Sequence, residues 1–157
     1  MRLALYQPDI PQNTGTIIRM AACLAIPVDL IGPAGFDMSD RNFRRAGLDY
    51  LPHASIERHL SFADFQTAMR AENHRLVLLT TKATTSHLDF VFAADDVLML
   101  GRESAGVPDD VHAAMDERIR IPLVPGMRSL NIAIAAAIVL GEALRQTRGF
   151  PGETGAM

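Results

Sequence analysis

Short hydrophobic runs alternate along the chain with longer segments in which apolar residues recur every three or four positions. Short runs rich in branched residues are typical of buried strands, and the longer periodic segments are typical of amphipathic helices. The predicted strands cover residues 3–6, 28–31, 76–79, 97–100 and 118–121. Because these strands alternate with helices, we expect an α/β fold with a mostly parallel sheet flanked by helices.

Capping and breaking residues bound the predicted helices. The first opens at residues 10–14 and ends before Pro27, and a short one begins after Ser39 and ends at Gly47. Ser61 is the expected N-cap of a helix over residues 62–71, and the strongest helical pattern runs from Ser129 to about Arg145. We expect one domain over residues 1–150, followed by a loose, turn-rich tail at 151–157.

The composition fits a folded domain, since 48% of the 157 residues are hydrophobic and 21% are charged. The lone Cys23 excludes an internal disulfide and is expected to be a small buried apolar residue. Pro8, Asp9 and Pro11 interrupt any secretory signal, and no apolar stretch approaches the roughly 20 residues of a membrane span. We therefore expect a cytoplasmic protein that has no membrane partner.

The basic residues are almost all arginines, and several of them are clustered, on a chain whose net charge is −3. Lys82 is the only lysine among fifteen basic residues, which reflects either genome composition or a need for bidentate phosphate contact. Arg41, Arg44 and Arg45 fall within five positions, and Arg128 precedes the last predicted helix. The cluster is either a solvated helix face or a phosphate-binding patch.

Three loops follow predicted strands in the second half of the chain, at residues 80–82, 101–106 and 122–129. Ligands bind beyond the carboxyl ends of strands in open α/β sheets, so these loops could form one pocket. The loop 101–106 has the glycine spacing of a P-loop, but Val107 and Pro108 stand where lysine and serine or threonine are required. This disfavours a nucleotide hydrolase. Glu103 suits a neutral or cationic ligand, and a structural turn is the alternative.

Metal chemistry finds little support in the sequence. No two histidines lie three or four positions apart, and the single cysteine adds no ligand pair. We expect no metal site, with the histidines at the surface or half-buried: His53, His59, His74, His87 and His112.

The last predicted helix is apolar almost all round, with alanines between Ile132, Ile134 and Ile138 and with Gly141 after them. Such a helix is buried on several sides. In so short a chain this favours a homodimer in which a partner subunit covers one face, and a central core helix of a monomer is the alternative.

Several motifs together resemble the SPOUT methyltransferases, a family of RNA-modifying enzymes. Asn13-Thr14-Gly15 with Arg19 resembles the first motif of that family, residues 98–106 the second, and residues 121–131 the third. Residues 6–15 and 44–50 further resemble the small tRNA (cytidine/uridine wobble) 2′-O-methyltransferases. The similarity extends from about Leu3 to Arg145.

The resemblance implies a C-terminal trefoil knot and a homodimer. It also implies an S-adenosylmethionine pocket formed by the knotted loops, largely through backbone groups. The cofactor-binding residues it indicates are Leu79, Gly101, Glu103, Ile121 and Ser129. The implied substrate is the anticodon loop of a tRNA, bound through phosphates by Arg19, Arg41, Arg44, Arg45 and Arg128.

Methylation of a ribose 2′-hydroxyl is the expected reaction, and it is chiefly a problem of alignment. Arg19 is expected to hold a phosphate and to stabilise negative charge on the oxygen, since a guanidinium is a poor base. Asn13 could orient Arg19 or the ribose, and Ser129 and Asn131 could close the site. The general base is not identified.

Two departures from the family pattern and three rival functions stay open. Arg102 replaces a usual proline, which either loosens the loop or adds an RNA contact, and Gly141 replaces a tyrosine of some relatives. The rivals are 2′-O-methylation of another tRNA position, methylation of ribosomal RNA, and an RNA-binding knotted dimer without turnover.

Overall fold

The computed structural model describes residues 1–37 and 41–152 and has alternating strands and helices. The elements in chain order are β1 (Arg2–Tyr6), α1 (Pro11–Cys23), β2 (Val28–Ile31), α2 (Arg41–Gly47), the 3-10 helix η1 (Leu48–His53), β3 (Ile56–His59), α3 (Phe62–Ala71), β4 (Arg75–Leu79), β5 (Thr85–Ser86), β6 (Asp96–Leu100), α4 (Asp109–Ala114), β7 (Glu117–Arg120) and α5 (Ile132–Thr147).

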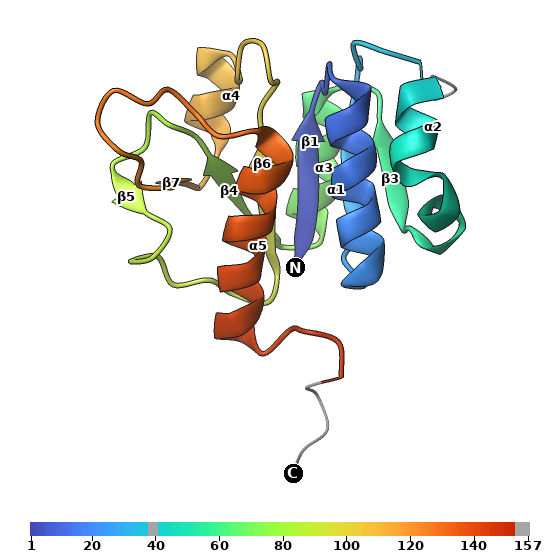
Figure 1. The fold of residues 1–157 in the computed structure, drawn as a ribbon. Coiled ribbons are helices and arrows are strands. Elements are labelled where there is room, and N and C mark those ends of the chain that lie inside the picture. The colour runs from blue at the N-terminus through green and yellow to red at the C-terminus, as the bar shows by residue number, and fades with distance from the viewer. Residues whose placement is uncertain (38–40, 153–157) are drawn as a thin grey trace.

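The strands form one sheet in the order β3-β2-β1-β6-β4-β7-β5, and every pair is parallel. All carboxyl ends therefore lie at the same edge of the sheet, which is at the top of Figure 1. The chain builds outward from β1 through β2 to β3, and then continues on the other side of β1. This reversal beside β6 is where open α/β sheets bind ligands.

Helices cover both faces of the sheet. Helices α1 and α5 lie on one face, with α2 beside α1, and α3 lies behind the sheet (Figure 1). Alternate side chains of β1 enter the two cores: Leu3 and Leu5 pack with α1 and α5, whereas Ala4 and Tyr6 pack in the cluster that contains α3. The predicted mostly parallel α/β domain is confirmed.

The strand predictions are accurate where a strand is fully buried. Strands β1, β2, β4 and β6 each match a predicted hydrophobic run to within a residue. Strand β7 begins and ends one residue earlier than predicted. Two strands were missed: β3 is an edge strand with two exposed residues in its middle, and β5 has only two residues.

Three further expectations need correction or fall outside the description. The last helix begins at Ile132 rather than Ser129, because the side chain of Asn131 accepts hydrogen bonds from the first free backbone N–H groups. Cys23 is exposed, not buried, since it lies in the last turn of α1 away from the core stripe of that helix. The proposed cap Ser39 and tail residues 153–157 lie outside the described residues.

Candidate functional site

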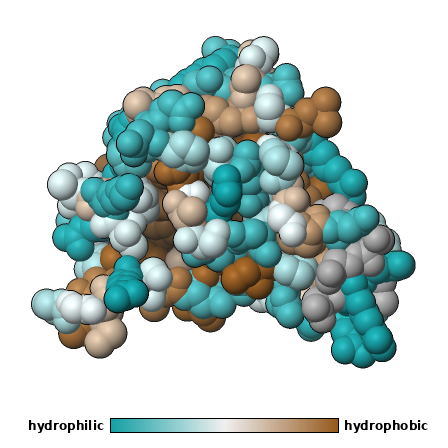
Figure 2. Space-filling view, turned by 90° about the horizontal axis from the view of Figure 1, so that it is seen from above, coloured by the Kyte–Doolittle hydropathy of each residue, from teal (hydrophilic) through white to brown (hydrophobic). Residues whose placement is uncertain are grey.

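A cavity of about 470 Å³ lies at the carboxyl ends of β4, β6 and β7. This volume is within the range of small-molecule and cofactor sites. Figure 2 looks onto this edge of the molecule, where hydrophobic surface is recessed between hydrophilic side chains. The cavity is lined by Ile10, Asn13, Leu78, Leu79, Thr80, Thr81, Leu100, Gly101, Arg102, Glu103, Gly106, Val107, Ile121, Leu123, Ser129, Leu130, Asn131, Ile132 and Ala135.

The three loops that follow predicted strands do meet at this cavity. Leu79 and Thr80 contribute from the first loop, Gly101 from the second, and Ile121 and Ser129 from the third. The beginnings of α1 and α5 complete the wall. The cavity thus collects these candidate cofactor and catalytic residues: Asn13, Leu79, Gly101, Glu103, Ile121, Ser129 and Asn131.

The loop 101–106 is closed on itself by backbone. The N–H of Arg102 donates to the carbonyl of Gly106 at 3.0 Å, and the N–H of Gly106 donates back at 2.9 Å. A Cβ on Gly101 would lie 2.8 Å from the Cα of Gly106, so only glycine fits there. Since proline has no N–H, the bond from the Arg102 N–H to Gly106 could not form if residue 102 were proline.

Asn131 joins the two helices at the cavity. As the N-cap of α5, its side-chain oxygen accepts from the N–H groups of Ala133 at 2.9 Å and Ile134 at 3.3 Å. Its amide nitrogen donates to Oδ1 of Asn13 in α1 at 3.0 Å. The segments of the first and third motifs are thereby held together, although the two residues are 118 positions apart.

Arg19 lies outside the cavity of its own chain. It is exposed on α1, and its guanidinium stacks on the ring of Tyr50 at 4.5 Å from the ring centroid. The same guanidinium donates to the phenol oxygen at 3.3 Å. Tyr50 belongs to η1, which follows directly after α2 and its exposed Arg41, Arg44 and Arg45. Arg19 is therefore beside the basic cluster rather than in the cavity.

Glu103 is the acidic residue of the cavity lining, and it is fixed by a residue that the sequence did not single out. The backbone N–H of Asp9 donates to Oε2 of Glu103 at 3.1 Å, and the hydroxyl of Ser104 donates to Oδ2 of Asp9. Burial and the neighbouring Asp9 carboxyl raise the pKa of Glu103 above its usual range. Asp9 was missed because its partner lies 94 positions away, with no local signal to connect them.

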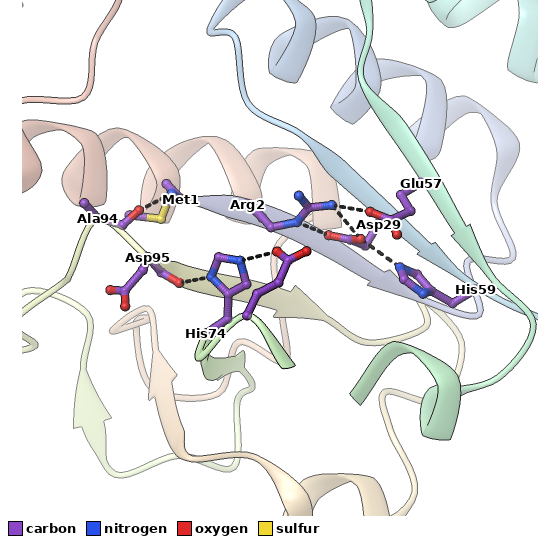
Figure 3. Close-up of polar contacts among 9 residues, drawn as sticks. Met1, Arg2, Asp29, Glu57, His59, His74, Ala94 and Asp95 are labelled. Carbon is purple, nitrogen blue, oxygen red and sulfur yellow. Dashed lines mark hydrogen bonds and ion pairs between the residues drawn. The ribbon is translucent and has the colours of Figure 1, made fainter. Parts of the chain in front are cut away.

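A second polar cluster lies on the neighbouring strands β1, β2 and β3 (Figure 3). Arg2 donates to the buried Asp29 at 2.8 Å and to Glu57 at 2.9 Å, and His59 Nε2 lies 2.8 Å from Asp29. His59 and also His87 are buried, which corrects the expectation that the histidines lie at the surface or are half-buried. Arg2 supplies the counter-charge that a buried carboxylate such as Asp29 requires.

That cluster is also the one group of potential metal ligands among the described residues. Asp29, Glu57 and His59 bring ligand atoms within 4.8 Å of one another. The guanidinium of Arg2 already bonds both carboxylates, so a cation there would compete with a built-in positive charge. The expectation that the protein uses no metal stays a prediction.

The helices of the described chain include none with both the length and the apolar character that crossing a membrane demands. The longest of them, α5, has 16 residues.

Comparison with known proteins agrees with this architecture. A family model described as the SpoU rRNA Methylase family matches residues 1–141. A tRNA (cytidine(34)-2'-O)-methyltransferase of Beijerinckia indica is 60% identical over 144 residues, 92% of this chain and 90% of that protein. The enzyme of the same name from Escherichia coli K12 is 41% identical over 155 residues, 97% of this chain and 96% of that protein.

Solved structures show the same fold. One described as "Structural insights into the 2-OH methylation of C/U34 on tRNA" is similar at a TM-score of 0.88 and 41% identity, covering 92% of this chain and 94% of that one. The SpoU methyltransferase AviRb from Streptomyces viridochromogenes, in complex with AdoMet, gives 0.83 and 30%, covering 93% of this chain and 60% of that one. The resemblance stated from the motifs is confirmed, and the chain belongs to the SpoU methylase family.

Proposed function

We propose that the protein transfers a methyl group from S-adenosylmethionine to the ribose 2′-hydroxyl of the wobble nucleotide, cytidine or uridine 34, in a tRNA. The observation that carries this proposal is the cavity formed by the loops that follow β4, β6 and β7. It occurs in a chain that aligns over nearly its whole length with tRNA (cytidine(34)-2'-O)-methyltransferases.

The residues of the cavity fit the cofactor. The close approach at Gly101 exposes backbone, and apolar side chains of Leu79, Leu100 and Ile121 offer a surface for an adenosine. The one acidic side chain of the lining, Glu103, suits a cationic ligand and would repel a pyrophosphate. When bound, S-adenosylmethionine supplies an electrophilic methyl group on a sulfonium sulfur.

The protein's own residues have to align and polarise the ribose. The pair Asn13 and Asn131 sets the distance between α1 and α5 at the cavity, and Ser129 lies in the same wall. Arg19 would hold a phosphate next to the reacting ribose and stabilise negative charge on the 2′-oxygen. A guanidinium does not serve as the proton acceptor, and the base is not assigned.

The basic cluster is the proposed grip on RNA. Arg41, Arg44 and Arg45 are close in sequence on α2 and next to the element that carries Tyr50, and Arg41, Arg44, Arg45 and Arg128 are all exposed. Phosphate contacts give salt-sensitive affinity without reading sequence. An anticodon loop offers unstacked nucleotides that a pocket can accept, so the geometry of the loop supplies the selectivity.

We also propose a homodimer that completes the site. Ile134 and Ile138 of α5 are 54% and 40% exposed, which leaves an apolar stripe next to the cavity. Arg19 is not among the residues that line the cavity of its own chain, so in this proposal the Arg19 of a partner subunit reaches it. A two-fold interface through α5 would bury the stripe and supply that residue.

The trefoil knot implied by the motifs is part of the same proposal. Its support is the contact of α5 with the segment between β5 and β6: the side chain of Gln146 accepts from the N–H of Phe92 at 3.0 Å and donates to the carbonyl of Phe90 at 3.0 Å. The cytoplasmic location expected from the sequence stays a prediction.

The test is transfer of labelled methyl from S-adenosylmethionine to bulk tRNA and, separately, to ribosomal RNA, both from a strain that lacks the gene. Nucleoside mapping should place the label in a 2′-O-methylated pyrimidine at position 34. Label in ribosomal RNA or at another tRNA position would replace the substrate, and cofactor binding without transfer to either RNA would indicate an RNA-binding protein without turnover.

A further inference from the structure

Two carboxyl groups from distant segments meet at the wall of the cavity. Asp9 comes from the loop between β1 and α1, and Glu103 from the loop after β6. The Asp9 N–H donates to Glu103, and the Ser104 hydroxyl donates to the Asp9 carboxylate. On the other side, an ideal Cβ on Gly35 would lie 2.8 Å from the Cβ of Asp9, so the Asp9 side chain has little room to move.

The two carboxyl groups interact with each other. The hydrogen bond with Glu103 lowers the pKa of Asp9, with a smaller contribution from Ser104, whereas burial and then the bond with Asp9 raise the pKa of Glu103. The buried Oδ1 of Asp9 receives no hydrogen bond from an N–H or hydroxyl of the described residues. Two adjacent carboxyl groups ionise in two coupled steps that belong to the pair, because loss of the first proton leaves a negative charge that opposes loss of the second.

Glu103 faces the cavity with few competing charges. Among the residues that line it, Glu103 is the only acid and Arg102 the only base. The guanidinium of Arg102 lies 6.0 Å from the centroid of the Tyr6 ring, a contact that directs its charge toward the ring. Glu103 is thus the lining group able to attract a cation.

We propose that Glu103 recognises the positive sulfonium of S-adenosylmethionine, that Asp9 is the positioning residue that holds it, and that the pair makes the site prefer the cationic cofactor to its neutral-sulfur product. This inference rests on the proposed cofactor. The amino and carboxyl groups of the methionine moiety are common to S-adenosylmethionine and S-adenosylhomocysteine, so the difference between the two ligands isolates the sulfonium. A site with this preference would release its product without a separate conformational step.

The preference depends on pH in a defined direction. A cation favours the ionised form of Glu103, so affinity for a cationic ligand rises as pH increases through the raised pKa of that carboxyl. The facing groups are Asp9 and Arg102, with Lys82 and His112 across the 101–106 loop in a small neighbouring hollow. The ratio of the affinities for a cationic and a neutral-sulfur ligand therefore reports Glu103.

The experiment is calorimetric titration of the full chain with two ligands, from about pH 5.5 to about pH 8. One is sinefungin, which carries an ammonium in place of the sulfonium and is not a methyl donor, and the other is S-adenosylhomocysteine. The unchanged chain should prefer sinefungin increasingly as pH rises. Glu103→Gln should bind sinefungin about tenfold more weakly and S-adenosylhomocysteine less than about twofold more weakly. The ratio of the two affinities should then no longer depend on pH.

Asp9→Asn is the second variant and separates positioning from mere packing. It keeps the shape of Asp9 but removes the charge that raises the pKa of Glu103, so the pH at which the preference appears should move lower. His112→Gln is the control and should leave the ratio and its pH dependence unchanged. Equal losses for both ligands in Glu103→Gln, or an unshifted midpoint in Asp9→Asn, would overturn the inference. Absence of binding by the unchanged chain would instead overturn the cofactor assignment.

Discussion

Arg19 is exposed, and its guanidinium lies against an aromatic ring. Its guanidinium lies 4.5 Å from the centroid of the Tyr50 ring and donates to the phenol at 3.3 Å. An unliganded surface arginine usually samples many rotamers, whereas this stack limits the entropy that RNA binding would cost. Tyr50 thereby holds the positively charged guanidinium of Arg19 next to the basic cluster on α2.

Replacing Arg19 with alanine should reduce methyl transfer by more than about a hundredfold, because stabilisation of a developing negative charge has effects of that size. Affinity for S-adenosylhomocysteine should stay within about twofold of the unchanged protein, since Arg19 does not line the cavity. Single-turnover kinetics and calorimetry measure the two quantities. The charge-matched control is Arg58→Ala on the edge strand β3, which should transfer methyl normally; unchanged turnover in Arg19→Ala would remove its catalytic role.

At the scale of residues, sequence motifs identified the cavity lining but not its supporting contacts. Gly101 and Asn131 were found because their types and spacing match a family motif. Asp9 and the bond from Asn131 to Asn13 could not be found, since each depends on a partner far away in the sequence. The burial of His59 was missed for the same reason: it is matched by Asp29, 30 positions away.

Helix α5 depends on one side chain for both its start and its link to α1. Asn131 caps the helix and donates to Asn13, so the two functions can be separated by substitution. Serine is a good N-cap but is too short to reach Asn13, whereas alanine provides neither contact.

We expect Asn131→Ala to lower the free energy of unfolding by about 1 kcal/mol and Asn131→Ser to leave it nearly unchanged. Both variants should lose about tenfold in the rate of methyl transfer, because both release α1 from α5 at the cavity. Urea unfolding and initial rates measure the two effects. Wild-type transfer by Asn131→Ser would show that the link to Asn13 does not matter for catalysis.

Asp116 connects three elements through its carboxylate. It accepts from Arg70 of α3 at 2.7 Å and from the backbone N–H of Leu76 in β4 at 2.7 Å, and it precedes β7. Burial opposes ionisation, but the bonds from Arg70 and Leu76 outweigh it and lower the pKa of Asp116. A lowered pKa in the folded state adds stability at pH values above the unfolded pKa, and that stability is lost as pH falls through the folded value.

Asp116→Asn should therefore cost about 1 kcal/mol of unfolding free energy at neutral pH, a figure reduced for the partial exposure of the pair. The difference from the unchanged protein should shrink as pH falls from about 4, the pKa of an unfolded aspartate, through the lower pKa of the folded Asp116 carboxyl. Urea unfolding across this pH range measures it. A difference that stayed constant with pH would assign the effect to packing instead.

At the scale of elements, prediction succeeded where burial alone determines structure. Strand β6 is buried at all five positions and was found directly from its hydrophobic run. Strand β3 was missed because its exposed Glu57 and Arg58 interrupt the pattern, and it pairs only with β2. The start of α5 was misplaced because residues 129–131 continue the helical pattern in sequence while forming the cavity wall.

The whole molecule has an apolar stripe on α5 that a single chain leaves uncovered. Ile134 is 54% exposed and Ile138 40%, and Leu130 next to them is 38% exposed. Apolar surface of this kind at the edge of a cavity is typical of an interface. The amino-acid pattern indicated this surface correctly, since the helix has almost no polar side, but it does not identify what covers it.

Ile138→Glu should convert a dimer into a monomer. Burying an unpaired carboxylate costs several kcal/mol, and a two-fold interface would bury one from each subunit. Sedimentation velocity should show half the mass, with loss of methyl transfer if a partner's arginine completes the site. The control is Leu60→Glu, which introduces the same charge at a residue that is 90% exposed. Ile56→Glu would not serve, because Ile56 packs against the core. A monomeric unchanged protein with full activity would contradict the proposed assembly.

The most direct measurement of the central proposal uses two synthetic anticodon stem-loops that differ in one atom. One has a ribose at the wobble cytidine and the other a 2′-deoxyribose, with labelled S-adenosylmethionine as the methyl donor. Transfer to the first and none to the second is the predicted result, because the 2′-oxygen at position 34 is the proposed acceptor. Equal labelling of both would contradict the account, since the methyl group would then be on a base or on another nucleotide.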